Sequence, residues 1–135
     1  MIRYENLNGE SIRISMEPKS NILELPSIGG FTPEEIGEDA FKGCKTITTA
    51  IIPEGVTAIR RGAFAGCTYL KDVVLPDSLE TIEDNAFEAC DIRYIRLPKN
   101  LKNLTSEAFY PNNKDVYIDV HQDNKYLHKF NGALY

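Results

Sequence analysis

Residues 60–67 read RRGAFAGC, and this stretch decides the fold because close copies of it recur along the chain. The other copies are GEDAFKGC at 37–44, EDNAFEAC at 83–90 and a weaker TSEAFY at 105–110. The phenylalanines of the first three copies, Phe41, Phe64 and Phe87, are 23 residues apart, and Phe109 follows after 22. A fixed step of this length is typical of a solenoid in which each copy forms one coil.

One coil is a residue shorter than the others. The prolines that follow each apolar run, Pro53, Pro76 and Pro98, are spaced by 23 and then by 22 residues. The segment CDIRYIRLP is one residue shorter than its predecessor CTYLKDVVLP, so the deletion lies between Cys90 and Pro98.

The apolar positions of the repeat predict how a coil is built. Alternation such as Val73-x-Leu75 predicts a strand with one buried face, and Ala-Phe-x-x-Cys predicts a short helical turn with its apolar groups on one side. Stacking the coils at about 4.8 Å forms a parallel sheet and brings equivalent Phe and Cys side chains into ladders. The clearest copy supplies the expected core residues Leu70, Val73, Leu75, Leu79, Ile82, Ala86, Phe87 and Cys90.

The spacing Leu-x-x-Val-x-Leu-Pro followed by Leu-x-x-Ile-x-x-x-Ala-Phe-x-x-Cys resembles the BspA-like class of leucine-rich repeats over about residues 22–135. The ending IDVHQDNKYLHKFNGALY resembles that family's irregular element, a strand followed by an Asn and a Tyr and then by Gly-x-Leu-Tyr. The resemblance implies a bacterial or phage-type binding or adhesion module, often at a cell surface, without shared catalytic residues.

We therefore predict an α/β fold, a leucine-rich-repeat solenoid with right-handed coils of about 23 residues and a parallel sheet on one face. Asn8-Gly9 between two alternating runs predicts a β-hairpin, so residues 1–20 are expected to cap the first coil. Residues 21–135 are expected to form the solenoid and an irregular C-terminal cap, within a single domain overall. An insertion, SIGGFTPEE, is expected to protrude as a loop, and the aromatic residues near the C-terminus to cover the last coil: Tyr117, Tyr126, Phe130 and Tyr135, with Leu134.

The composition narrows the classes of partner. The 135 residues carry a formal net charge of −5 and no dense basic cluster, which argues against nucleic acid and anionic membrane surfaces. The N-terminus lacks the apolar run of a signal peptide, and no stretch reaches the length of a spanning helix. As written, the sequence predicts a cytoplasmic or virion-associated protein, or a cell-surface protein if an export signal lies outside it. It does not fix the oligomeric state.

Candidate catalytic and metal-binding residues are few. Cys44, Cys67 and Cys90 occupy equivalent repeat positions, where stacking predicts parallel, buried, reduced thiols instead of ligands converging on one metal. His121 and His128 are expected to be surface or loop residues. Common nucleophile, nucleotide and zinc motifs are absent from the sequence, and we expect no enzyme, cofactor or metal site. The adjacent carboxylates Glu34-Glu35 and Glu83-Asp84 are expected to flank turns instead of forming an acid/base pair.

The repeat register predicts the residues that face outward from the parallel sheet, which is the usual contact surface of curved repeat arrays. Exposed apolar and aromatic groups with charges around them suit protein recognition. We expect a protein partner and leave a glycan open; the alternative is a virion or surface-appendage subunit that docks through its caps. The two outward rows read Ile22, Thr49, Asp72, Tyr94 and Tyr117, and Glu24, Ile51, Val74, Arg96 and Asp119.

Overall fold

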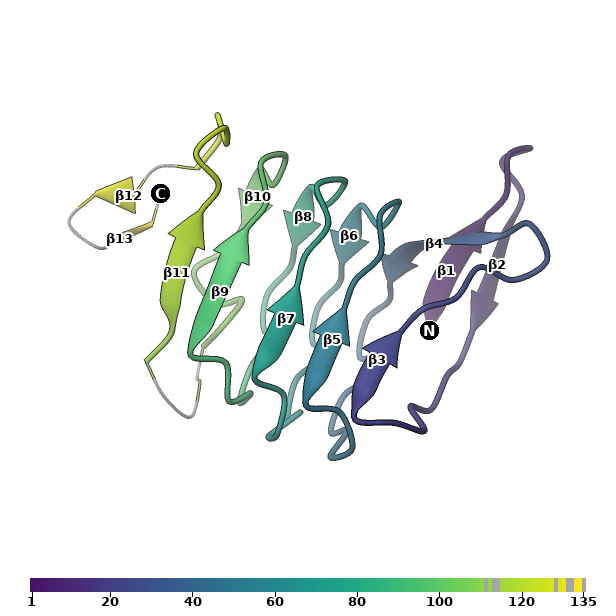
Figure 1. Cartoon of the computed structure of the whole chain (residues 1–135), viewed down its shortest axis with the longest axis horizontal. Helices are drawn as coiled ribbons and strands as arrows, with labels where there is room; N and C mark the ends of the chain where they lie inside the picture. The colour runs from purple at the N-terminus through teal and green to yellow at the C-terminus, as the bar shows by residue number, and fades with distance from the viewer. Residues whose placement is uncertain (111, 113–114, 128, 131–132, 135) are drawn as a thin grey trace.

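The computed structural model describes residues 1–110, 112, 115–127, 129–130 and 133–134. Its coils stack side by side into a flattened solenoid with one strand of each coil in a front sheet and one in a back sheet (Figure 1). The predicted solenoid is confirmed. The front strands are β3 (Ile22–Glu24), β5 (Thr49–Ile51), β7 (Asp72–Val74), β9 (Tyr94–Leu97) and β11 (Tyr117–Val120).

The back sheet continues into the N-terminal hairpin. Strands β1 and β2 pair antiparallel, which confirms the hairpin, and β1 also pairs antiparallel with β4. The hairpin therefore lies at the N-terminal end of the stack and extends the back sheet (Figure 1). The back strands are β1 (Ile2–Glu5), β2 (Ser11–Ile14), β4 (Thr32–Ile36), β6 (Ala58–Ile59), β8 (Thr81–Ile82) and β10 (Asn103–Leu104); β12 (Lys129–Phe130) and β13 (Ala133–Leu134) pair antiparallel at the other end.

The predicted helical turns are wrong, and the described residues are β structure and turns instead of α/β. In the segment around Phe64, every second backbone amide donates a hydrogen bond to the carbonyl three residues earlier and so forms a tight turn. Ala65 N, for example, donates to Gly62 O. The intervening amides donate to the next coil instead, Phe64 to Ala86 O at 2.7 Å and Gly66 to Glu88 O at 2.8 Å. Gly62 and Gly66 have positive φ, which a right-handed helix does not tolerate.

Stacked aromatic rings run through the core along the coils. Phe41 and Phe64 have ring centroids 5.4 Å apart, Phe64 and Phe87 5.3 Å, and Phe87 and Phe109 5.4 Å, all close to parallel. These distances confirm the predicted Phe ladder. Most of the other expected core residues are also buried, but Val73 and Leu75 are only partly so.

The front sheet is interrupted at the shortened coil. The described strands pair as β3-β5-β7 and β9-β11, and no ladder joins β7 to β9 although the two strands are neighbours. The segment that leads into β9 is the one that is a residue shorter than in the other coils. The amides of this segment therefore no longer meet the carbonyls of the previous coil in register. Asp91 N instead donates to Leu70 O at 2.9 Å. The interruption leaves Val73 of β7 and the following Leu75 partly open to solvent.

Two expectations for the coil ends need correction. Only the start of the SIGGFTPEE insertion is a protruding turn, in which Ile28 and Phe31 exchange backbone hydrogen bonds, because the segment from Thr32 belongs to β4. Tyr117 and Tyr126 do not cover the last coil, since both are more than half exposed. Leu127 is buried in their place; the side chains of Phe130, Leu134 and Tyr135 lie outside the described residues.

A chain of ion pairs links the hairpin to the back of the solenoid. Glu35 accepts from Arg3 at 3.2 Å and from Arg60, and Arg60 also contacts Glu83 at 3.4 Å. Partial burial raises the pKa of Glu35, but the hydrogen bonds from the two arginines outweigh it and hold the pKa below its ordinary value. The ionised Glu35 side chain therefore stabilises the fold fully at pH values above the ordinary pKa of a glutamate. This contribution is lost as the pH falls through the lowered pKa of the folded state.

Replacing Glu35 with glutamine is expected to lower the free energy of unfolding at neutral pH by about 1 kcal/mol, since the partly exposed pairs are screened by solvent. The deficit is expected to shrink as the pH falls from about 7 to about 3, because the wild-type carboxylate then also becomes neutral. Urea denaturation at several pH values measures both effects. Exposed Glu38→Gln is the matched control, and an equal deficit for Glu35→Gln at both pH extremes would contradict the role of its charge.

Candidate protein-binding surface

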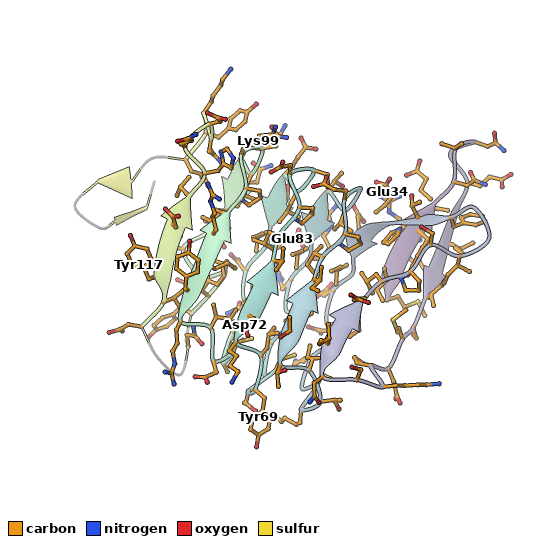
Figure 2. The ribbon with its side chains drawn as sticks, viewed as in Figure 1. Glu34, Tyr69, Asp72, Glu83, Lys99 and Tyr117 are labelled. Atoms are coloured by element: carbon orange, nitrogen blue, oxygen red, sulfur yellow. The ribbon has the colours of Figure 1, made fainter. Side chains whose placement is uncertain are left out.

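The front sheet brings the predicted site residues together in two outward rows. The strand registers align Ile22, Thr49 and Asp72 in one row and Glu24, Ile51 and Val74 in the next. Beyond the interruption, Tyr94 aligns with Tyr117 and Arg96 with Asp119. Most of these side chains are exposed, with Thr49 and Asp119 half-buried. Figure 2 shows Asp72 in the middle of this face and Tyr117 toward its C-terminal end.

Tyr94 and Tyr117 form an ordered aromatic pair on this surface. Their ring centroids are 5.8 Å apart and the planes differ by 9°. The Tyr94 hydroxyl donates to an Asp119 carboxylate oxygen at 3.1 Å, and Arg96 Nε lies 4.0 Å from the same oxygen. Desolvation and this hydrogen bond raise the pKa of Tyr94. The hydrogen bond and the stacking restrain the Tyr94 ring, which lowers the entropy lost when a ligand packs against it.

A pocket of about 350 Å³ lies where the front sheet is interrupted. Its walls are mostly apolar, from Val74 on β7 and the following Leu75 to Tyr94 and Leu97 on β9. Polar groups from Asp77, Arg96 and His121 also line it. An apolar depression with a few polar groups is suited to receive an apolar side chain of another molecule.

A second, polar pocket of about 280 Å³ lies beside the first halves of the same two strands. Asp72 of β7 and Tyr94 of β9 form its walls together with Lys71, Asp91 and Arg93. Tyr94 lines both pockets, so the two depressions adjoin along the β7–β9 boundary.

Several pocket residues were missed by the sequence analysis. Leu75 was expected in the core but is only partly buried, and Asp77 and Pro98 were assigned no site role. His121, expected on the surface or in a loop, is half-buried, lines the apolar pocket and accepts from Asp123 N at 3.0 Å. His128 lies outside the described residues. The one available signal was the 22-residue step, which marks the shortened coil.

The three cysteines are free thiols, as predicted, but Cys44 is only partly buried, so the expectation of burial is wrong for that residue. Cys67 and Cys90 are buried and donate to the carbonyls of Phe41 and Phe64, at 3.1 and 3.2 Å. Burial raises the pKa of Cys67 to about 11 and that of Cys90 further, so both are protonated at neutral pH. Within the part of the chain that the structure describes, no group of three or more His, Cys, Asp or Glu residues could hold a metal ion.

Among the described residues, no helix has the length and apolar character that crossing a membrane requires.

The fold and its exposed strand face define a repeat solenoid. Residues 34–131 match the BspA type leucine rich repeat region, in six copies. The match covers well over half of the chain, which therefore belongs to the BspA-type leucine-rich repeat family. A comparison with curated proteins gives no match.

Solved bacterial structures share this fold. A leucine-rich repeat protein from Bacteroides capillosus is similar with a TM-score of 0.71 and 26% identity, over 89% of this chain and 94% of that one. A leucine rich cell surface protein from Faecalibacterium prausnitzii is 32% identical with a TM-score of 0.65, over 72% of this chain. The match spans only 25% of the F. prausnitzii protein. A T. pallidum leucine rich repeat protein is 28% identical with a TM-score of 0.56, over 68% of this chain and 55% of that one.

Proposed function

We propose that this chain is a non-enzymatic binding module that captures a partner protein on its front sheet. The observation that carries the proposal is the apolar pocket at the β7–β9 interruption, beside the ordered Tyr94–Tyr117 pair. Binding energy in protein interfaces concentrates on aromatic and arginine residues around such pockets. The likeness to a cell-surface protein of F. prausnitzii supports a cell-surface setting for this binding. A glycan remains the alternative ligand for the same surface.

The second candidate is an assembly subunit that docks through its caps, with residues 1–20 as the N-terminal cap. It is favoured by Leu7, whose side chain is fully exposed in the loop between β1 and β2. Strand β2 is also the outermost strand of the back sheet and has a free edge among the described residues. Such an edge is a template for pairing with another chain.

Val74→Asp is expected to reduce capture of the partner at least about tenfold, because it places a charge in the wall of the apolar pocket. Combined substitution of Tyr94 and Arg96 by alanine is expected to abolish capture. The measurement is a binding assay with the partner purified from the native source, using the intact chain as bait and light scattering to follow assembly.

The matched control is Leu7→Asp, the same change at an exposed apolar residue far from the front sheet. It is expected to leave capture unchanged. The front sheet would be rejected as the binding surface if Val74→Asp captured the partner undiminished. Loss of self-assembly in Leu7→Asp at the same time would favour the assembly subunit.

A further inference from the structure

We propose that the polar pocket at the β7–β9 boundary binds an arginine side chain of the partner, stacked on the Tyr94 ring and paired with Asp72, while an apolar side chain two residues away fills the adjoining pocket. This inference rests on the proposed function and adds the chemistry of the partner segment. Its first support is the arrangement of the Tyr94 ring. One face stacks on Tyr117, so the opposite face is directed toward β7, where both Tyr94 and Asp72 line the pocket.

Asp72 supplies the negative charge that pairs with the arginine, which the Tyr94 ring alone does not provide. Its side chain is exposed and makes no ion pair within the described part of the chain. Asp119, the other acid on this half of the sheet, is already engaged by Tyr94 and Arg96. A planar guanidinium stacks on an aromatic face while its edge donates two parallel hydrogen bonds to a carboxylate. A lysine ammonium is a point charge and matches this combination less well.

The charge of the face favours a basic ligand. Among the ten residues of the two outward rows, three are acidic and one is basic, which gives a net charge of −2 (1 − 3 = −2). The other charged groups of the polar pocket are Lys71, Asp91 and Arg93, and these add one net positive charge at the end of the pocket where the strands begin. The arginine is therefore placed at the Asp72 side of the pocket, away from Lys71 and Arg93.

The two pockets follow one another with the spacing of an extended chain. Asp72 lines the polar pocket and Val74, two residues along the same strand, lines the apolar one. Side chains two residues apart on an extended segment point to the same face and lie about 6.6 Å apart. A partner segment that runs alongside β7 and carries Arg-x-Leu, or another large apolar residue at the last position, thus reaches both pockets at once.

A synthetic peptide tests this assignment directly. The probe is acetyl-Gly-Arg-Ser-Leu-Gly-amide, added to the isotope-labelled full chain while backbone amide signals are followed by NMR. We expect saturable shifts at Asp72, Val74 and Tyr94, with millimolar affinity. Replacing the arginine by citrulline, which keeps the shape without the charge, is expected to weaken binding at least about fivefold. Asp72→Asn is expected to weaken binding of the arginine peptide similarly and to reduce the difference between the two peptides to the part that stacking on Tyr94 contributes.

Equal binding of the arginine and citrulline peptides, shifts confined to another surface, or an unchanged affinity in Asp72→Asn would overturn the arginine assignment. Asp72 is exposed, so its replacement leaves the core intact, and unchanged signals of Phe64 and Phe87 verify this. The proposed function fails separately, when Val74→Asp leaves capture of the natural partner undiminished. Capture that is sensitive to Val74→Asp but insensitive to Asp72→Asn would keep the front sheet as the binding surface and reject only the arginine.

Discussion

Phe64→Ala is expected to cost about 3–5 kcal/mol of the free energy of unfolding, a large part of the 5–15 kcal/mol typical of a whole domain. Phe64 is fully buried and stacks on both sides, against Phe41 at 5.4 Å and Phe87 at 5.3 Å. Alanine removes the ring from the middle of the ladder and leaves a cavity between two coils. Because coils of a solenoid are held together by contacts with their neighbours, the loss uncouples the first coils from the rest.

Urea denaturation followed by circular dichroism measures this loss. With a denaturant slope of about 2 kcal/mol per M, the transition midpoint is expected to fall by about 2 M. Phe109→Ala is the matched control, since Phe109 stacks only on Phe87 among the described rings and keeps 8% of its surface exposed. A smaller loss is expected there. Equal losses at Phe64 and Phe109 would contradict a ladder that couples the coils from its centre.

The repeat pattern alone predicted the stacking order of the coils. Parallel coils place equivalent residues next to one another, so the 23-residue step was sufficient to align Phe41 with Phe64 and Asp72 with Thr49. The outward rows followed from the same alignment and the alternation of side chains along a strand. Their role in binding does not follow from register, because exposure alone does not show what covers a surface.

The repeat pattern did not predict the backbone geometry of the turns. Apolar groups at the Ala-Phe-x-x-Cys positions gather on one side both in a helical turn and in the tight turns observed. The difference lies in backbone angles, and positive φ occurs at Gly62 and also at Asn85, the equivalent position one coil later. Gly62 was the available sign, since glycine adopts positive φ at no steric cost. Asn85 carries no comparable sign, although Asn tolerates this conformation better than most residues.

The shortened coil was visible in the sequence, but its consequence was not. Removal of one residue can be absorbed in a loop, a strand or a turn. In this protein the strand phase is retained on both sides, with Ile95 and Leu97 buried, and the change falls on the pairing between β7 and β9. The resulting pocket depends on which hydrogen bonds the chain gives up, which only the three-dimensional packing of neighbouring coils determines.

Asn124→Ala is expected to destabilise the C-terminal coil by about 2–4 kcal/mol, because four hydrogen bonds converge on this one side chain. Its amide nitrogen donates to Pro98 O at 2.8 Å and to Leu101 O at 2.9 Å, carbonyls of the preceding coil. Its oxygen accepts from the amides of Tyr126 and Leu127, both at 2.8 Å. Asn124 thus closes the last turn onto the solenoid and holds Leu127 in the core.

The isosteric change Asn124→Asp separates the two halves of this network. Aspartate keeps the acceptor for Tyr126 and Leu127 but loses both donors. It also places a negative charge next to the carbonyl oxygens of Pro98 and Leu101. The variant is therefore expected to lose at least as much free energy of unfolding as the alanine variant. Hydrogen exchange locates the effect, which is expected as faster exchange at Leu127 and in β9 with little change in β5. An Asn124→Asp variant as stable as the wild type would show that the donor pair contributes nothing and that the side-chain acceptor for Tyr126 and Leu127 is sufficient to hold the turn.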